Sequence, residues 1–255
     1  MNKLLLDVGN TLTEIGLFRD QEKIFSWRFA SKLYGTEDEL AIVIRNFLRM
    51  QNDTPDSIKR LGLSSVVPEM TFVIERYCHK YINIKPMIVS AASKLPIQID
   101  YNQPESVGAD RICGAVAAYR LYSDDCIIID FGTATTLDAI THKGVYKGGA
   151  ITLGINGLID TLHNKASKLP KVGLSIPKKY IGNSTEYSIQ SGVFLGTVEM
   201  INGMVTAFKR ELKNPNAKVI LTGGHSAFIA KSIHSVDLLE PDLILNGLNQ
   251  IMELN

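Results

Sequence analysis

The sequence predicts an α/β protein built from two related halves, and three observations support this. An apolar strand that ends in Asp-x-Gly occurs twice, at residues 3–10 and again at 126–133. The two aspartates, Asp7 and Asp130, stand 123 residues apart in a chain of 255, which is the spacing of an internal duplication. Strand-like segments also alternate with segments of helical periodicity in both halves, as in α/β proteins.

In the first half, residues 4–6, 14–18 and 23–29 are predicted strands, with a tight glycine-containing turn after the first. Between residues 37 and 51, apolar side chains recur at the spacing of a half-buried helix. A strand is predicted at 61–66, followed by a helix that Pro68 opens, because proline is tolerated in a first helical turn. A short strand at 87–89, a polar loop at 101–108 and a helix at 109–122 complete this half.

The second half repeats the pattern with strands predicted at residues 126–129 and 137–141 and a strand entering a turn at 148–151. Helices are predicted at 155–166, 188–212 and 243–254, and a strand at 218–221. No stretch is rich enough in proline or serine to be a flexible linker. We therefore predict two packed domains, residues 1–122 and 123–255, with a hinge near 122–125.

Composition and charge limit the classes of function. The chain is 45% hydrophobic, with 27 basic and 26 acidic residues and a net charge of +1, so charge gives no case for nucleic acid or an anionic membrane as partner. The cysteines are odd in number and widely spaced (Cys78, Cys113 and Cys126). This spacing argues against a disulfide framework or zinc site. With no signal-like or continuous membrane-spanning apolar run, we expect a soluble, cytoplasmic protein.

The two Asp-x-Gly turns are candidate phosphate-binding sites. Glycine lets a turn present backbone N–H groups to phosphate, a nearby hydroxyl can donate to it, and a carboxylate at the strand end can hold a cation. The turns at residues 7–11 and 130–136 both fit this description. One such turn alone is more often an ordinary hairpin. The two commonest other nucleotide-binding glycine motifs are absent from the sequence.

Two further segments each allow a functional interpretation and a purely structural one. Thr222-Gly223-Gly224 follows a predicted strand, where glycines either let an adenine ring lie on the backbone or simply end the strand. Asp110 lies at a predicted helix N-terminus, where it is either a first-turn acid that interacts favourably with the helix dipole or a general base. If Asp110 is the general base, Arg111 orients the substrate or offsets the charge that develops during the reaction.

Taken in order, these segments resemble type III pantothenate kinases over essentially the whole chain. The matching segments are Asp7-Val-Gly-Asn-Thr11, Tyr101 before Gly108-Ala-Asp-Arg111, Asp130-Phe-Gly-Thr-Ala-Thr-Thr136, Gly148-Gly-Ala-Ile151, Ser184-Thr185 before Gln190-Ser-Gly192, and Thr222-Gly-Gly224. The second and third are distinctive. The resemblance implies a duplicated fold of the actin and sugar-kinase type (ribonuclease H-like).

The resemblance also implies an activity: phosphorylation of pantothenate by ATP, the first step toward coenzyme A. Asp110 would be the catalytic proton acceptor, and Asp130 would hold a monovalent cation, K⁺ or NH₄⁺, while Mg²⁺ accompanies ATP. Pantothenate would be contacted by Tyr101, Gly108, Ala109, Asp110, Arg111 and Thr185. ATP would be contacted by Asp7, Val8, Gly9, Asn10, Thr11, Leu12, Thr13, Glu14 and Thr133. Members of the family are homodimers, so a homodimer is expected here.

Two residues depart from the family pattern. Many relatives carry a basic residue where Glu14 stands, and many carry proline where Leu153 precedes Gly154. We expect weaker ATP contacts at the first position and altered loop stiffness at the second. Two rival functions remain open: another enzyme of the same fold, such as a sugar or acetate kinase or a polyphosphatase, and a catalytically silent regulatory protein that binds ATP.

Overall fold

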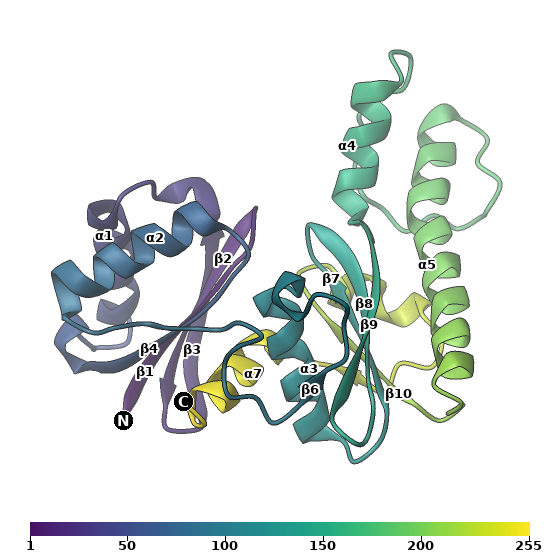
Figure 1. Cartoon of the computed structure of the whole chain (residues 1–255). Helices are drawn as coiled ribbons and strands as arrows, with labels where there is room; N and C mark the ends of the chain where they lie inside the picture. The colour runs from purple at the N-terminus through teal and green to yellow at the C-terminus, as the bar shows by residue number, and fades with distance from the viewer. The chain divides into compact units, whose positions relative to one another are not determined.

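The computed structural model describes residues 1–255 as two compact units (Figure 1). Unit 1 comprises Met1–Arg120 and Asp242–Asn255, and unit 2 comprises Leu121–Pro241. The chain thus leaves unit 1 close to the predicted hinge and returns to it for its last helix. The predicted division into residues 1–122 and 123–255 instead places that helix in the second half, because a boundary drawn from local pattern alone gives each unit one continuous segment.

Unit 1 contains a mixed sheet with the strand order β3-β2-β1-β4-β5. Its strands are β1 (Asn2–Val8), β2 (Leu12–Arg19), β3 (Glu22–Ala30), β4 (Ile58–Ser65) and β5 (Met87–Ile88). The first three pair antiparallel, whereas β1, β4 and β5 run parallel. The parallel alignment brings the carboxyl ends of β1 and β4 to the same edge of the sheet.

Helices cover both faces of this sheet. Leu4 and Leu6 of β1 belong to one core with the buried residues of α1 (Glu37–Arg49) and α2 (Pro68–Tyr77). On the opposite face Gly62 of β4 lies against Met252 of α7 (Leu243–Met252). The alternation of side chains along each strand therefore assigns α1 and α2 to one side and α7 to the other.

Local sequence sets the ends of the first two helices. Thr36 and Glu39 form a capping box at the start of α1, in which each side chain bonds the other residue's backbone N–H. Pro68 occupies the first turn of α2, as predicted. After Tyr77 the helix widens into a π-turn, Cys78–Ile82, and ends at Asn83 in the left-handed conformation.

The C-terminal helix is fixed to unit 1 by a buried cation. Lys3 of β1 is almost fully buried, and its ammonium group donates to Asn249 Oδ1 at 2.8 Å and pairs with the carboxylate of Glu253. A buried ammonium group is costly unless it is paired and hydrogen-bonded. The return of α7 to unit 1 therefore satisfies a charge at the very start of the chain.

Unit 2 repeats the topology of unit 1. Its strands are β7 (Cys126–Phe131), β8 (Ala134–Ile140), β9 (Val145–Leu153), β10 (Lys218–Thr222) and β11 (Leu238–Leu239). They lie in the order β11-β10-β7-β8-β9, with antiparallel β7, β8 and β9 and parallel β10. This order matches β5-β4-β1-β2-β3, so the predicted duplication is confirmed.

The remaining elements complete the two units. Unit 1 also contains the two-residue β6 (Gln98–Ile99) and α3 (Ala109–Leu121), which ends at the boundary. Unit 2 contains α4 (Ile155–Lys165), α5 (Thr185–Glu211) and the short α6 (Ser226–Ile229). Single-turn 3-10 helices lie at Ser31–Leu33, Pro55–Ser57, Pro104–Ser106 and Ala230–Ser232.

The long helix α5 has the length and composition of a membrane-spanning segment, although the sequence has no continuous apolar run of that size. Its inward-facing residues pack in the core of unit 2 against β7 and β10; they include Ile189, Val193, Phe194, Val198 and Ile201. The core helix of a soluble protein has these same properties, so α5 is weak evidence for a membrane.

Candidate active site

The first candidate phosphate turn begins where β1 ends. Asp7 lies directly opposite Ser64 on the parallel strand β4, and the Ser64 hydroxyl donates to Asp7 Oδ1 at 2.7 Å. The turn itself closes through a bond from the Gly9 N–H to the Leu12 carbonyl oxygen at 3.0 Å. A fully buried serine thus sets the orientation of the aspartate.

The N-terminus of α3 lies at the same edge of the unit 1 sheet. A Cβ atom at Gly108 would lie 3.4 Å from Cγ1 of Val66, which follows β4 directly. The Asp110 carboxylate folds back over Gly108, where a Cβ atom would overlap it, and it accepts a bond from the Arg111 N–H at 2.7 Å. A side chain at position 108 would therefore displace the carboxylate of the candidate base from this position.

Cys113 connects these two parts of the site. It lies one helical turn after Asp110 on α3 and is fully buried. Burial raises the pKa of its thiol well above the ordinary value, and the charges of Asp7 and Asp110 raise the pKa further, against the effect of a hydrogen bond with Ser64. Both predicted carboxylates therefore lie close enough to one thiol for their charges to act on it.

The second candidate phosphate turn, in unit 2, is built in a similar way. Asp130 lies near the end of β7, and the following turn closes through a bond from the Gly132 N–H to the Ala134 carbonyl oxygen at 3.0 Å. The Gly154 N–H then donates to the Thr133 carbonyl oxygen at 3.0 Å. A Cβ atom at Gly154 would overlap the Gly132 and Thr133 carbonyl oxygens, so the start of α4 rests directly on this turn.

The Thr222-Gly223-Gly224 segment forms a tight turn beside Asp130. Thr222 pairs with Asp130 in the register between β10 and β7. Gly223 has a φ of +89°, and a Cβ atom there would overlap Asp130 Oδ1 and lie 2.6 Å from the Phe131 nitrogen. Only glycine fits this position without displacing the aspartate.

The predicted ATP contacts divide into two groups in the structure. Gly9, Asn10 and Thr11 form the turn, whereas the side chains of Val8 and Thr13 are buried in unit 1. The buried pair can meet a ligand only through the backbone, since a strand turns alternate side chains into the core.

Leu12 and Glu14 flank the buried Thr13. The Leu12 side chain is exposed, and the Glu14 carboxylate accepts a bond from Arg28 Nε at 2.8 Å. Arg28 is the cross-strand partner of Glu14 on β3. A guanidinium group therefore stands beside the acidic residue that departs from the family pattern.

The remaining predicted contacts lie in loops and helix ends. Tyr101 is exposed in the loop between β6 and α3 of unit 1. Thr185 begins α5 in unit 2, directly after Ser184, whose hydroxyl accepts a bond from the Tyr187 N–H. The structure thus places Asp7 to Glu14, Tyr101 and Gly108 to Arg111 in unit 1, and Asp130, Thr133 and Thr185 in unit 2.

Sequence reasoning missed Ser64 and Cys113 as parts of the candidate site. Ser64 belongs to the pair Ser64-Ser65 at the end of a predicted strand, and nothing in the local sequence distinguishes this pair from any other strand end. Its only distinguishing signal is the register that sets it opposite Asp7. Such a register joins residues that are far apart in the sequence.

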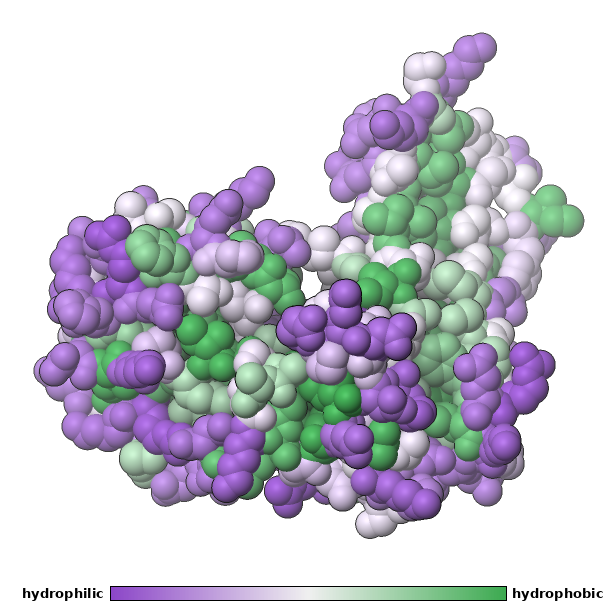
Figure 2. Space-filling view, viewed as in Figure 1, coloured by the Kyte–Doolittle hydropathy of each residue, from purple (hydrophilic) through white to green (hydrophobic).

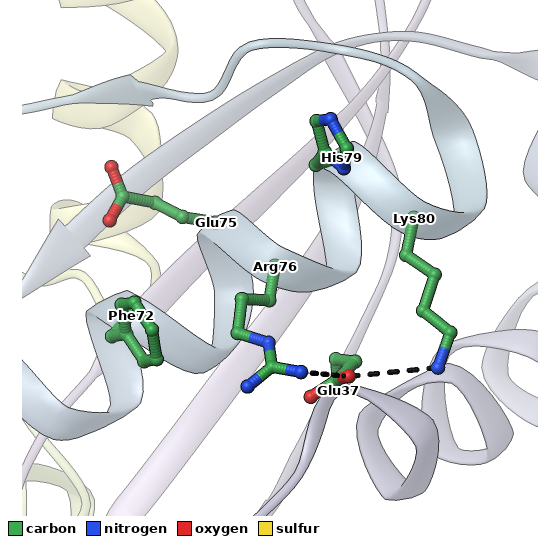
Figure 3. Close-up of a pocket in the computed structure, with 6 residues that line it drawn as sticks. All are labelled: Glu37, Phe72, Glu75, Arg76, His79 and Lys80. Carbon is green, nitrogen blue, oxygen red and sulfur yellow. Dashed lines mark hydrogen bonds and ion pairs between the residues drawn. The ribbon is translucent and has the colours of Figure 1, made fainter.

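A surface pocket on α2 and the following π-turn lies apart from these motifs (Figure 3). It is lined by Glu37, Phe72, Glu75, Arg76, His79 and Lys80. Arg76 and Lys80 both pair with Glu37, at 2.7 and 3.6 Å. No predicted site residue lines this pocket, and its Arg76 and Lys80 already have acidic partners, so we do not assign it to the active site.

Comparison with known proteins gives concordant matches. Residues 3–207 match the type III pantothenate kinase family. A type III pantothenate kinase of Halalkalibacterium halodurans is 39% identical over 252 residues, covering 99% of each chain. The corresponding protein of Listeria innocua is 38% identical and covers 99% of this chain and 97% of its own.

Solved structures agree on the fold. A protein of Sinorhizobium meliloti assigned as a 2-dehydro-3-deoxygalactonokinase has a TM-score of 0.61 at 10% identity, covering 98% of this chain and 96% of its own. A protein of Campylobacter jejuni assigned to the Baf family of transcriptional activators has a TM-score of 0.61 at 19% identity, with 98% and 97% covered. At these identities the likeness establishes the fold alone, the duplicated actin and sugar-kinase type, as predicted.

Proposed function

The chain belongs to the type III pantothenate kinase family, and we propose that it transfers the γ-phosphoryl group of ATP to the primary hydroxyl of pantothenate, the first step of coenzyme A biosynthesis. The observation that carries this proposal is that Asp7, bonded by Ser64 of β4, and Asp110, whose helix begins beside Val66 directly after β4, lie at the same edge of the unit 1 sheet. Phosphoryl transfer to an alcohol needs a proton acceptor close to the groups that hold phosphate.

Each predicted residue has a role in this proposal. Asp110 accepts the proton of the pantothenate hydroxyl, and Arg111 offsets the charge that develops during transfer. The turn after Asp7 binds phosphate through its backbone N–H groups. Pantothenate is contacted by Tyr101, Gly108, Ala109, Asp110, Arg111 and Thr185, and Thr133 contacts ATP.

We further propose that Asp130 holds a monovalent cation, K⁺ or NH₄⁺, and that Mg²⁺ accompanies ATP. The surroundings of Asp130 fit a hard cation, because such ions take oxygen ligands. The Thr222 hydroxyl, from the residue paired with Asp130, is buried and has no hydrogen-bond partner. The cation would offset phosphate charge at this turn.

The whole proposal predicts pantothenate-dependent ADP release that requires the monovalent ion. In a coupled assay with ATP and Mg²⁺, Asp130→Asn should raise the half-saturating K⁺ concentration by more than about tenfold, because even groups that only support a metal ligand have effects of this size. Asp160→Asn is the control, since Asp160 is a half-exposed acid of α4 that pairs with Lys171. ADP release that is indifferent to pantothenate would contradict the proposed substrate. Release that depends on pantothenate and not on the ion would contradict only the cation site.

We also propose that the protein is a cytoplasmic homodimer that associates through unit 2. Its three cysteines are free and buried, in keeping with a reducing compartment. Apolar residues gather over α4 and the neighbouring part of α5 (Figure 2). The exposed apolar residues of unit 2 include Ile151, Leu153, Ile176, Tyr180, Ile181 and Tyr187. A large exposed apolar surface favours burial against a second copy.

The dimer can be tested with a matched pair of substitutions. Ile151 in unit 2 and Ile42 in unit 1 are 64% and 63% exposed. By light scattering after gel filtration, the wild-type protein should have about twice the chain mass of 28.1 kDa. Ile151→Asp should shift it toward the mass of one chain, because a buried unpaired carboxylate is costly, whereas Ile42→Asp should not. A monomeric wild-type protein would contradict the proposal.

A further inference from the structure

A chain of buried hydroxyl groups lies beneath the first phosphate turn. Ser31 directly follows β3, and its hydroxyl donates to the Gly9 carbonyl oxygen at 2.6 Å. Thr13 Oγ1 of β2 lies 3.0 Å from Ser31 Oγ, and the Tyr34 hydroxyl lies 3.4 Å from Thr13 Oγ1. Thr13, Ser31 and Tyr34 are all buried.

The direction of donation along this chain follows from hydrogen counting. A carbonyl oxygen can only accept, so the single hydrogen of Ser31 is committed to Gly9. Thr13 must then donate to Ser31, and Tyr34 must donate to Thr13. Burial raises the pKa of the Tyr34 hydroxyl above its ordinary value, so this group stays protonated and can donate. The chain therefore ends in one fixed acceptor, the Gly9 carbonyl.

Holding this carbonyl also orients the next amide. In a planar trans peptide the C=O and N–H groups point in opposite directions. With the Gly9 carbonyl directed toward buried Ser31, the N–H of exposed Asn10 points away from the core. The Ser31 N–H also donates to the Thr11 carbonyl oxygen at 3.0 Å. Ser31 thus holds two carbonyl groups of the turn, those of Gly9 and Thr11, by hydrogen bonds.

We propose that Ser31 and Thr13 are positioning residues for phosphoryl transfer, which hold the Gly9–Asn10 peptide so that the Asn10 N–H faces an ATP phosphate. This inference rests on the proposed binding of ATP at this turn. Tyr34 continues the chain more weakly because of its longer hydrogen bond. None of these three side chains touches the phosphate, so each acts through the backbone.

Removing the Ser31 hydroxyl should therefore weaken the binding of ATP and leave the binding of pantothenate unchanged. Without its bond the peptide can rotate and the phosphate loses a donor, so Ser31→Ala should weaken equilibrium binding of a non-hydrolysable ATP analogue by about 10- to 100-fold. The KM for ATP should rise to match, while the KM for pantothenate stays unchanged. Ser31→Thr keeps the hydroxyl and should restore binding. Ser57→Ala, which removes a hydroxyl bond to the Thr54 carbonyl in unit 1, is the control.

Double substitution tests the chain itself. Thr13→Val should weaken ATP binding less than Ser31→Ala, and the double variant should bind no more weakly than Ser31→Ala alone, because Thr13 acts only through Ser31. A Ser31→Ala protein that is less stable but binds the analogue like wild type would overturn the positioning role. A wild-type protein that binds no analogue would overturn the proposed function as well.

Discussion

Asp110→Asn should lower kcat for pantothenate phosphorylation by about 10²- to 10⁴-fold, the usual contribution of a general base. The amide keeps the shape of the carboxylate but cannot accept the hydroxyl proton. The change leaves the phosphate turns intact, so equilibrium binding of ATP should stay within a few-fold of wild type. Steady-state kinetics with both substrates varied, together with calorimetric binding of an ATP analogue, separates the two effects.

The control for this substitution is the first-turn acid of another helix. Asp110 lies in the first turn of α3 and Glu69 in the first turn of α2. If Asp110 only stabilises the helix, both Asp110→Asn and Glu69→Gln should cost about 0.3–1 kcal/mol of stability and leave kcat unchanged. Normal kcat in Asp110→Asn would therefore refute its role as the base.

Gly247→Ala should destabilise unit 1 by at least about 3 kcal/mol, at the upper end of the usual cost of overpacking. Gly247 lies on α7 where this helix crosses α3, and a Cβ atom there would overlap the backbone carbonyl of Cys113. The obstacle is backbone rather than a flexible side chain, so α3 and α7 must separate. Denaturant unfolding monitored by circular dichroism should show the loss as a lower midpoint.

The matched substitution is Gly203→Ala on α5. Gly203 is also helical, but a Cβ atom there meets nothing within 4 Å. Because alanine is the better helix former, this variant should be about as stable as wild type or up to about 1 kcal/mol more stable. Equal unfolding midpoints for the two variants would show that the α3–α7 crossing can adjust to a methyl group. In that case Gly247 would not set the position of the helix that carries Asp110.

Local pattern determined most of the secondary structure. The helical spacing of Leu40, Ile44 and Phe47 predicted α1, and Pro68 marked the start of α2 where the structure has it. The repeated Asp-x-Gly turn predicted the duplication that the two matching strand orders confirm. These features could be predicted because each depends on residues within about one or two turns of each other.

The sequence by itself thus determined the fold class, the two strand-end turns and, through family resemblance, the candidate site residues. Only the tertiary structure decided that the last helix returns to unit 1, that Ser64 supports Asp7, and that Ser31 and Thr13 lie beneath the phosphate turn. The physical reason is that these contacts join residues far apart in the sequence. The ammonium group of Lys3, for example, donates to Asn249 across 246 positions of the chain. Strand register and helix crossings set such contacts, and the periodicity of a local segment does not specify them.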